Sequence, residues 1–271
     1  MAPLRLPLAA LLLGARLVPS SGALEVQRMD EAAAQLRDDA CFLQLLSDSP
    51  APRVADPLVY ALTVDTAIGR ERYASLAASV GQLGITSLQK VEGVSVAKYP
   101  TKEALQASHM ALMSEEQKRF WDTTGRSNGA LACAIGHSYI WRLAREALSK
   151  PGAPRWAVIL EDDASVNATM SLNDALAKVS NEADLAFFDG RFCRFYRPGL
   201  IGAGLPRSWG STAYAVTARG AAALLAEPIF LPSDEWLNVP IREGKVKGFC
   251  GDVIFFEHPG GKSERFDYVG E

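Results

Sequence analysis

Three consecutive acidic residues follow a short apolar segment in the middle of the chain. Residues 156–160, Trp-Ala-Val-Ile-Leu, have the character of a buried strand, and Glu161, Asp162 and Asp163 come directly after them. Carboxylates this close raise one another's pKa and cost free energy unless solvent screens them or a cation lies among them. Carboxylate oxygens are also the ligands that Mg²⁺ and Mn²⁺ prefer. The pattern therefore predicts either a solvated acidic turn or a cation site.

A second pair of acids stands in the segment Leu-Pro-Ser-Asp-Glu-Trp-Leu, residues 231–237. The proline and the polar residues after it are typical of a helix start, where Ser233 or Asp234 would be the N-cap and acids are favoured in the first turn. A carboxylate can also accept the proton of an attacking hydroxyl group. Both interpretations stay open for these two residues.

Cys133, His137 and Trp141 are spaced by four residues, which places them on one face of a helix. Such a face favours the core. Cys133 and His137 could instead begin a site for a soft metal, although no further ligand lies near them in the sequence. His258 follows the last apolar segment, where it is either a loop residue or an additional ligand.

The elements that must position these residues alternate between strands and helices. We expect strands near 58–64, 86–94, 183–190 and 248–259, helices at 69–84 and 128–150, and a strand, turn and helix within 210–227. The order strand-helix-strand predicts parallel pairing with right-handed crossovers. The expected fold is an α/β domain with a single, doubly wound, mostly parallel sheet flanked by helices. In such sheets ligands bind at the carboxyl ends of the strands, where the acidic triplet lies.

Composition limits the classes of partner. The chain has 271 residues, of which 48% are hydrophobic and 22% charged, as in soluble globular proteins. Its net charge of −3 gives no basic field for a phosphate backbone, so we expect no nucleic-acid partner.

The N-terminal residues have the pattern of a targeting segment. A basic start, an apolar run and small residues make 1–23 a predicted signal peptide, and no stable membrane span is expected. An organelle transit peptide is the alternative. Residues 24–57 would form a helix and a proline-rich linker, and 58–271 the main domain. We therefore expect the lumen of the endoplasmic reticulum or Golgi.

Two other features bear on that compartment. The sequon at 167–169, Asn-Ala-Thr, would suit a glycoprotein. The four cysteines, 41, 133, 193 and 250, are far apart and form no C-x-x-C pair, which argues against a structural zinc site. Cys193 and Cys250 could form a disulfide, but the spacing does not determine the pairing.

Four segments resemble, in order, the motifs of glycosyltransferase family 25, which includes bacterial lipooligosaccharide and procollagen galactosyltransferases. They are LACAIGHSYIWRLA (131–144), WAVILEDDASV (156–166), GSTAYAVTARGAAALL (210–225) and LPSDEWL (231–237). The similarity spans about residues 58 to 260.

The resemblance implies a GT-A-like fold, a UDP-sugar donor, Mn²⁺ or Mg²⁺ as cofactor, and inversion at the anomeric carbon. By position it implies that Glu161 and Asp163 contact the metal and the diphosphate, and that Asp162 lies near the sugar nucleotide. It implies a donor-site role for His137 and a further metal-ligand role for His258. One of Asp234 and Glu235 would be the base or bind the acceptor, Asp234 being the first candidate.

The segment after the first strand departs from this family. Its members carry an Asn-Leu-Asp-Arg-like stretch, whereas Thr63 and Val64 stand here in place of the first two residues. Asp65, Arg70 and Arg72 can be matched and are predicted to bind the nucleotide. The difference would alter donor affinity or nucleotide choice.

These patterns lead to one main hypothesis and two alternatives. The main one is a metal-dependent inverting glycosyltransferase that moves a hexose, galactose by resemblance, from a UDP-sugar to a hydroxyl of a glycan or protein. A catalytically silent relative that binds a sugar nucleotide or glycan is the second. A metal-dependent phosphohydrolase is the third, but the additional carboxylates of a two-metal centre are not evident in the sequence.

Overall fold

The structure is a computed structural model that describes residues 56–99, 104–105, 119, 121–123, 127–166, 170–189, 199–201, 210–227 and 231–257. All of them belong to one unit of the chain, residues 54–271. The predicted signal peptide, the predicted helix at 26–48, the sequon, Cys41, Cys193 and His258 lie outside the described residues.

A mixed eight-stranded sheet forms the centre of the described part, in the order β2-β1-β3-β7-β5-β8-β4, with β6 also paired to β8. Strands β2, β1, β3, β5 and β8 run in one direction, whereas β7, β4 and β6 run in the other. The strands are β1 (Leu58–Thr63), β2 (Gln89–Glu92), β3 (Ala157–Glu161), β4 (Ala164–Val166), β5 (Leu185–Asp189), β6 (Gly199–Ile201), β7 (Ala213–Val216) and β8 (Gly248–Glu257).

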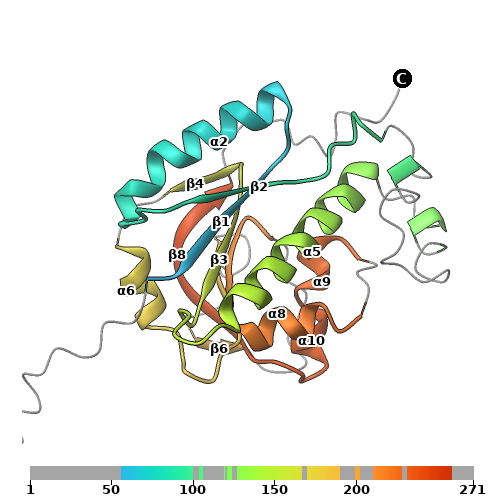
Figure 1. Cartoon of the computed structure of the whole chain (residues 1–271). Coiled ribbons are helices and arrows are strands. Elements are labelled where there is room, and N and C mark those ends of the chain that lie inside the picture. Colours follow the sequence, from blue (N-terminus) through green and yellow to red (C-terminus); the bar gives the residue numbers. More distant parts are fainter. Residues whose placement is uncertain are drawn as a thin grey trace, which may run out of the picture. The chain divides into compact units, whose positions relative to one another are not determined.

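Helices cover both faces of this sheet (Figure 1). On one face lie α5 (Asn128–Leu148), α8 (Ala218–Leu224), α9 (Ser233–Trp236) and α10 (Val239–Arg242). On the other lie α2 (Ala67–Val80), which continues into the 3₁₀ turn η1 (Gly81–Leu83), and α6 (Leu172–Ala177). The α/β class and the doubly wound arrangement expected from the sequence are confirmed.

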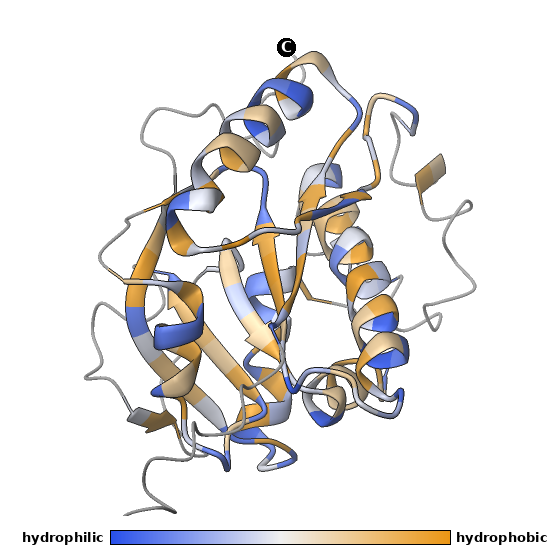
Figure 2. Ribbon diagram, turned by 60° about the vertical axis from the view of Figure 1, so that its left-hand side comes forward, coloured by the Kyte–Doolittle hydropathy of each residue, from blue (hydrophilic) through white to orange (hydrophobic). Residues whose placement is uncertain are grey.

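The core has two halves because side chains alternate along each strand. Tyr60 and Leu62 of β1 face the α5 side, whereas Val59 and Ala61 face the α2 side. Figure 2 shows the consequence: the strands are mainly hydrophobic, and the helices carry both hydrophobic and hydrophilic residues. Strands of this kind are buried on both faces, so polar groups gather at the strand ends.

The turn from β1 into α2 is unusually tight. The Thr66 side chain caps α2 by accepting a hydrogen bond from the Gly69 N–H at 3.0 Å. A Cβ atom on Gly69 would lie 2.1 Å from the Val64 carbonyl oxygen, so only glycine lets the helix begin this close to the strand. At the other end Gly84 has φ 76° and stops the helical segment.

The predicted strands and helices of the main domain are found close to their expected positions. One expectation needs refinement, because β7 runs antiparallel between β3 and β5. The sequence pattern of a buried strand carries no direction, so the antiparallel pairing of β7 could not be predicted from it. Five strands share one direction all the same, so the sheet is mostly parallel.

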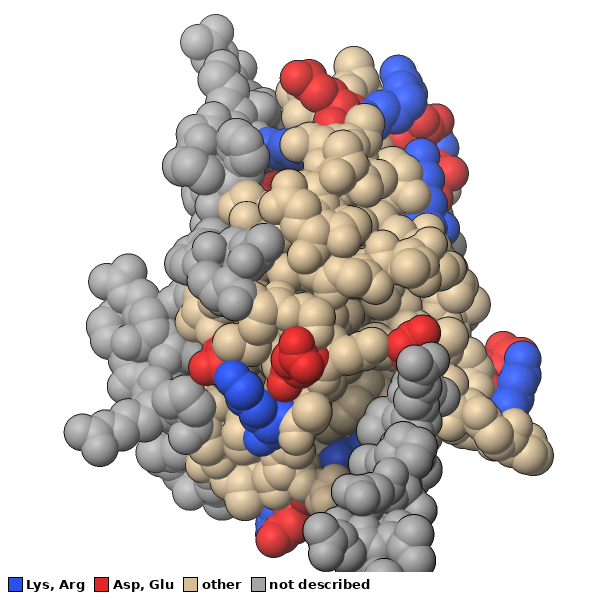
Figure 3. Space-filling model, turned by 90° about the vertical axis from the view of Figure 1, so that its left-hand side faces the viewer, with Lys and Arg blue, Asp and Glu red and all other residues tan. Residues whose placement is uncertain are grey.

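The surface carries charges of both signs. On the face drawn in Figure 3 acidic and basic side chains lie next to one another in small groups. Exposed pairs of this kind, such as Lys178 with Asp252 at 2.8 Å, add little to stability. Within the described ranges no helix combines the length and apolar character needed to cross a membrane.

Candidate active site

A cleft opens where the carboxyl ends of β1, β2 and β3 meet. The register of the sheet pairs Leu62 with Glu161 and Thr63 with Glu92, so the three strands end at the same level. The cleft is lined by the end of β1, the loop after β2, the first turns of α5 and the acidic triplet: Leu62, Thr63, Val64, Arg72, Gly93, Val94, Val96, Gly129, Ala132, Cys133, Glu161, Asp162 and Asp163.

The acidic triplet is held by its backbone. Glu161 is the last residue of β3, and Asp162 and Asp163 form the turn into β4. The Glu161 N–H donates to the Thr212 carbonyl at 2.9 Å, and the Asp162 N–H donates to the Leu62 carbonyl at 3.0 Å. All three side chains are half-buried and line the cleft. The arrangement therefore gathers three carboxylates at one wall of a cavity.

The Glu161 side chain is only 12% exposed. Its Oε1 atom accepts a hydrogen bond from the Ser211 hydroxyl, which precedes β7. The same oxygen lies 3.0 Å from His137 Nε2, on α5. Glu161 thus links three elements, namely β3, β7 and α5.

His137 is fully buried and bonded at both ring nitrogens. Nδ1 lies 2.8 Å from the Tyr214 hydroxyl, which in turn accepts a hydrogen bond from the Trp141 indole N–H at 2.7 Å. Burial alone would lower the pKa of His137, but the adjacent Cys133 and Glu161 raise that pKa to about 9. At neutral pH the ring is therefore an imidazolium that forms an ion pair with Glu161. The core position expected for His137 is confirmed, with side chains of Glu161 and Tyr214 as its partners.

Cys133 and Ser233 extend the same network toward α9. The Cys133 sulfur lies 3.4 Å from the Ser233 hydroxyl and 3.9 Å from Glu161 Oε1. The hydroxyls of Ser211 and Ser233 are 3.0 Å apart. One potential ligand atom each from Cys133, His137 and Glu161 lies within 4.8 Å of the others. Sequence spacing does not reveal the third member, because Glu161 is 24 residues from His137.

Asp234 and Glu235 occupy the first turn of α9 and are half-buried. The Asp234 Oδ1 atom accepts a hydrogen bond from the Glu235 N–H at 3.0 Å, and the Asn238 side chain donates to the Asp234 carbonyl at 2.8 Å. The N-cap residue of α9 is Pro232, and no side chain caps this helix by a hydrogen bond, so the capping interpretation of these acids is not supported. Ser233, the residue before them, joins α9 to the network around Glu161, so both acids lie within one or two residues of the site.

The three residues matched after β1 have different surroundings. Asp65 and Arg70 form an exposed ion pair at 2.8 Å, and the hydrogen bond from Arg70 lowers the pKa of Asp65. Arg72 instead lines the cleft. Arg72 is therefore the best placed of the three to contact a bound molecule in this cleft.

Thr63, the last residue of β1, and Val64, directly after it, both line the cleft. The Thr63 hydroxyl donates to the Gly69 carbonyl at 3.0 Å, and Thr63 is only 2% exposed. This hydrogen bond stabilises the turn into α2, so the Thr63 hydroxyl is engaged within the protein.

Three residues of the site were not singled out as candidates from the sequence: Ser211, Ser233 and Tyr214. Each is at most 1% exposed, and each bonds to a group of the acidic or histidine network. Small hydroxyl residues beside a strand or helix start are common capping residues, so their types carried no specific signal. Their position next to motif residues was the available clue.

Comparisons with known proteins give weak similarity only. No protein-family model matches the chain, and no curated protein matches its sequence. A glycosyltransferase involved in the glycosylation of the major capsid of PBCV-1 is similar in structure with a TM-score of 0.39 and 11% identity over 77% of this chain and 97% of that one. Mouse xyloside xylosyltransferase 1, in its apo form, has a TM-score of 0.31 and 12% identity over 73% of this chain and 79% of that one. The function of this chain has to be inferred from its own residues.

Proposed function

We propose that this chain is a metal-dependent inverting glycosyltransferase of the family 25 type, which transfers a hexose, galactose in our hypothesis, from a UDP-sugar to a hydroxyl of a glycan or protein. The observation that carries the proposal is the acidic triplet lining a cleft at the carboxyl ends of β1 and β3. This is the part of an α/β sheet where ligands bind. The four ordered motif segments support the same assignment.

The donor atoms fit the proposed Mn²⁺ or Mg²⁺. Asp162 and Asp163 provide carboxylate oxygens in a turn that borders the cleft, and such ions bind through one or two carboxylates together with phosphate oxygens of the substrate. When bound there, the ion would supply Lewis-acid stabilisation of the charge on the departing UDP.

Other residues of the cleft fit a nucleotide. The Arg72 guanidinium has the planar donor geometry that binds phosphate oxygens. Apolar and small residues such as Val64, Gly93 and Val94 form a wall against which a uracil ring could pack. In this proposal the chain binds the donor along the ends of β1 and β2 and places its diphosphate at the acids.

The acceptor hydroxyl needs a proton acceptor in an inverting transfer. We assign this role to Asp234, with Glu235 as the alternative, because both follow Ser233, whose hydroxyl contacts Ser211 and Cys133 beside the triplet. The carboxylate would take the proton as the hydroxyl oxygen attacks the anomeric carbon and the bond to UDP breaks.

We also propose that the protein acts in the lumen of the secretory pathway. Cys250 is disulfide-bonded. Disulfides persist in oxidising compartments, which agrees with the signal-peptide pattern at 1–23.

One observation favours a second candidate, a silent module that binds a sugar nucleotide. The Thr63 hydroxyl donates to the Gly69 carbonyl, so the position that carries an amide in family 25 has its polar group engaged within the protein. Donor binding without turnover would support this candidate.

The test is release of UDP from UDP-galactose by the purified protein, measured with Mn²⁺ and again with excess chelator. We expect metal-dependent release that falls about 100-fold in Asp163→Asn, because a lost metal ligand removes several kcal/mol of charge stabilisation. Glu146→Gln, an exposed change on α5, is the matched control and should keep wild-type activity. Release that persists in Asp163→Asn or in chelator would overturn the proposal.

A further inference from the structure

We propose that Cys133, His137 and Glu161 form a binding site for a thiophilic divalent cation of the Zn²⁺ type, chemically separate from the oxygen donors of Asp162 and Asp163. The Cys133 sulfur, the His137 Nε2 and the Glu161 Oε1 atoms lie within 4.8 Å of one another. Sulfur, imidazole nitrogen and carboxylate oxygen together are a donor set that Zn²⁺ prefers. This site goes beyond the glycosyl transfer proposed above and does not depend on it.

The present spacing of the three atoms suits one ion. Zinc binds sulfur at about 2.3 Å and nitrogen or oxygen at about 2.0–2.2 Å, so the ligand atoms of a tetrahedral site lie roughly 3–4 Å apart. Here Nε2 and Oε1 are 3.0 Å apart, and Sγ and Oε1 are 3.9 Å apart. Small side-chain movements would therefore be enough to place a cation among them.

Regular elements hold the three ligands in place. Cys133 and His137 are one helical turn apart on α5 and point to the same side. Glu161 ends β3, and its backbone N–H is fixed to Thr212. A site whose ligands come from a helix and a strand end needs little ordering when the ion binds.

A second layer of contacts orients these ligands. The Tyr214 hydroxyl contacts His137 Nδ1 and is itself held by Trp141, which directs Nε2 toward Glu161. Ser211 donates to Glu161, and Ser233 contacts Cys133. Metal-binding histidines usually have such a partner on the other ring nitrogen, and the partner fixes the orientation of the ring.

The site is accessible although His137 is fully buried. Cys133 and Glu161 both line the cleft, which gives a path for the cation and room for a water molecule as fourth ligand. Binding would replace the hydrogen bond between His137 and Glu161, and Cys133 and His137 would hold the ion through their unprotonated sulfur and nitrogen atoms. A thiolate and a carboxylate then balance the two positive charges of the ion.

This assignment changes the role predicted for Glu161. Its Oε1 atom faces the sulfur and the imidazole, so Glu161 would serve the thiophilic site, whereas Asp162 and Asp163 would remain for a hard cation. A Zn²⁺ ion at this position would join α5 to the end of β3 directly beside the donor cleft.

The experiment uses Co²⁺ as a spectroscopic substitute for Zn²⁺ in the metal-free full chain. We expect a thiolate-to-cobalt charge-transfer band in the wild type that disappears in Cys133→Ser, and Zn²⁺ affinity that falls at least tenfold in Cys133→Ser and in His137→Gln, measured by competition with a chelating dye. Circular dichroism of each variant verifies folding. Cys133 is half-buried, so Cys133→Ser should fold even where His137→Gln does not.

Asp163→Asn is the matched control because it alters the neighbouring carboxylate without touching the three ligands. It should keep the cobalt band and the Zn²⁺ affinity. No thiolate band in the wild type, the same band in Cys133→Ser, or an equal loss of Zn²⁺ affinity in Asp163→Asn would each overturn the proposal. Mn²⁺-dependent UDP release is measured on the same samples. This measurement tests the proposed transferase function independently, so a failure of the Zn²⁺ site can be distinguished from a failure of that function.

Discussion

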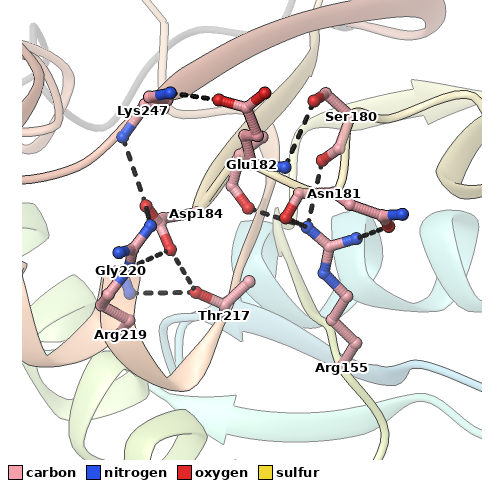
Figure 4. A network of polar contacts seen from close by, with 10 residues as sticks. Arg155, Ser180, Asn181, Glu182, Asp184, Thr217, Arg219, Gly220 and Lys247 are labelled. Atoms are coloured by element: carbon pink, nitrogen blue, oxygen red, sulfur yellow. Dashed lines mark hydrogen bonds and ion pairs between the residues drawn. The ribbon is translucent and has the colours of Figure 1, made fainter.

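The network around Asp184 and the network around Glu161 lie at opposite ends of the same sheet. Asp184 precedes β5, and its carboxylate accepts hydrogen bonds from Arg219 Nε at 2.7 Å, Arg219 Nη2 at 2.6 Å and Thr217 Oγ1 at 3.2 Å (Figure 4). The Lys247 N–H also donates to it, at 3.2 Å. A buried carboxylate is here fully surrounded by donors.

Arg155, before β3, belongs to the same end of the sheet. Its guanidinium donates to the carbonyl oxygens of Ser180, Asn181 and Ala183 at 2.9–3.0 Å (Figure 4). These contacts join the start of β3 to the loop that leads into β5. This end of the sheet is therefore fastened by charge-assisted hydrogen bonds to the backbone.

The network around Glu161 is built from different groups and borders a cleft. It contains a thiol, an imidazolium, a phenol and two serine hydroxyls, and its carboxylate continues into Asp162 and Asp163 on the cleft wall. Strand β7 connects the two ends, since Ser211 stands just before it and Thr217 just after it. The comparison indicates that Asp184 serves stability, whereas in our proposal Glu161 serves both stability and a site.

The titration of His137, which lies beside Cys133 and Glu161, gives a pH test of this difference. The folded-state pKa of His137 is raised to about 9, above the ordinary 6.5, so its contribution to stability is fully present below pH 6.5 and is lost as the pH rises through 9. We expect the unfolding free energy of the metal-free wild type to fall relative to that of His137→Gln over this interval. Urea unfolding at several pH values measures it, and a pH-independent difference would contradict the assignment.

Removing the Asp184 carboxylate, at the opposite end of the sheet from Glu161, should affect stability alone. Asp184→Asn is expected to lower the free energy of unfolding by about 2 kcal/mol, because hydrogen bonds to a charged group are lost in a buried position. UDP release at room temperature should stay at the wild-type level. Arg219→Gln is the milder control, expected below about 1 kcal/mol because the Arg219 side chain is 67% exposed. A large loss of activity in Asp184→Asn would remove the distinction between the two networks.

Tyr214→Phe should sharpen the role of the network around Glu161. The change leaves the Trp141 indole N–H and one His137 nitrogen without their buried partner, which costs about 1–2 kcal/mol. Thermal unfolding gives the stability effect, and UDP release gives the effect on the site. We expect the melting temperature and the rate of UDP release both to fall. A Tyr214→Phe variant in which neither quantity falls would show that the phenol is dispensable.

Arg72 and Arg70 allow the cleft to be compared with the adjacent surface. Arg72→Gln is expected to raise the KM for the UDP-sugar about tenfold with little change in kcat, because the guanidinium would contact the donor before and during transfer. Arg70→Gln should leave both constants unchanged, since Arg70 pairs with Asp65 on the surface. Equal effects of the two changes would be inconsistent with donor binding at Arg72.

Sequence patterns predicted the elements and the place of the triplet, because strands and helices of this length have clear periodicity and β3 ends in acids. The contacts of the site were not predictable in the same way. Tyr214 meets His137 across 77 residues, a pairing that depends on the reversed direction of β7. Similarly, Arg70 and Arg72 look alike in sequence, and only their positions on α2 distinguish a surface pair from a cleft residue.

The most direct test of the account is calorimetric titration of the protein with UDP, with and without Mn²⁺. Acids that hold a cation against the donor diphosphate predict UDP binding at least about tenfold tighter with Mn²⁺, and no such gain for uridine, which has no phosphate to contact the ion. UDP affinity that is the same in Mn²⁺ and in chelator would contradict the central claim.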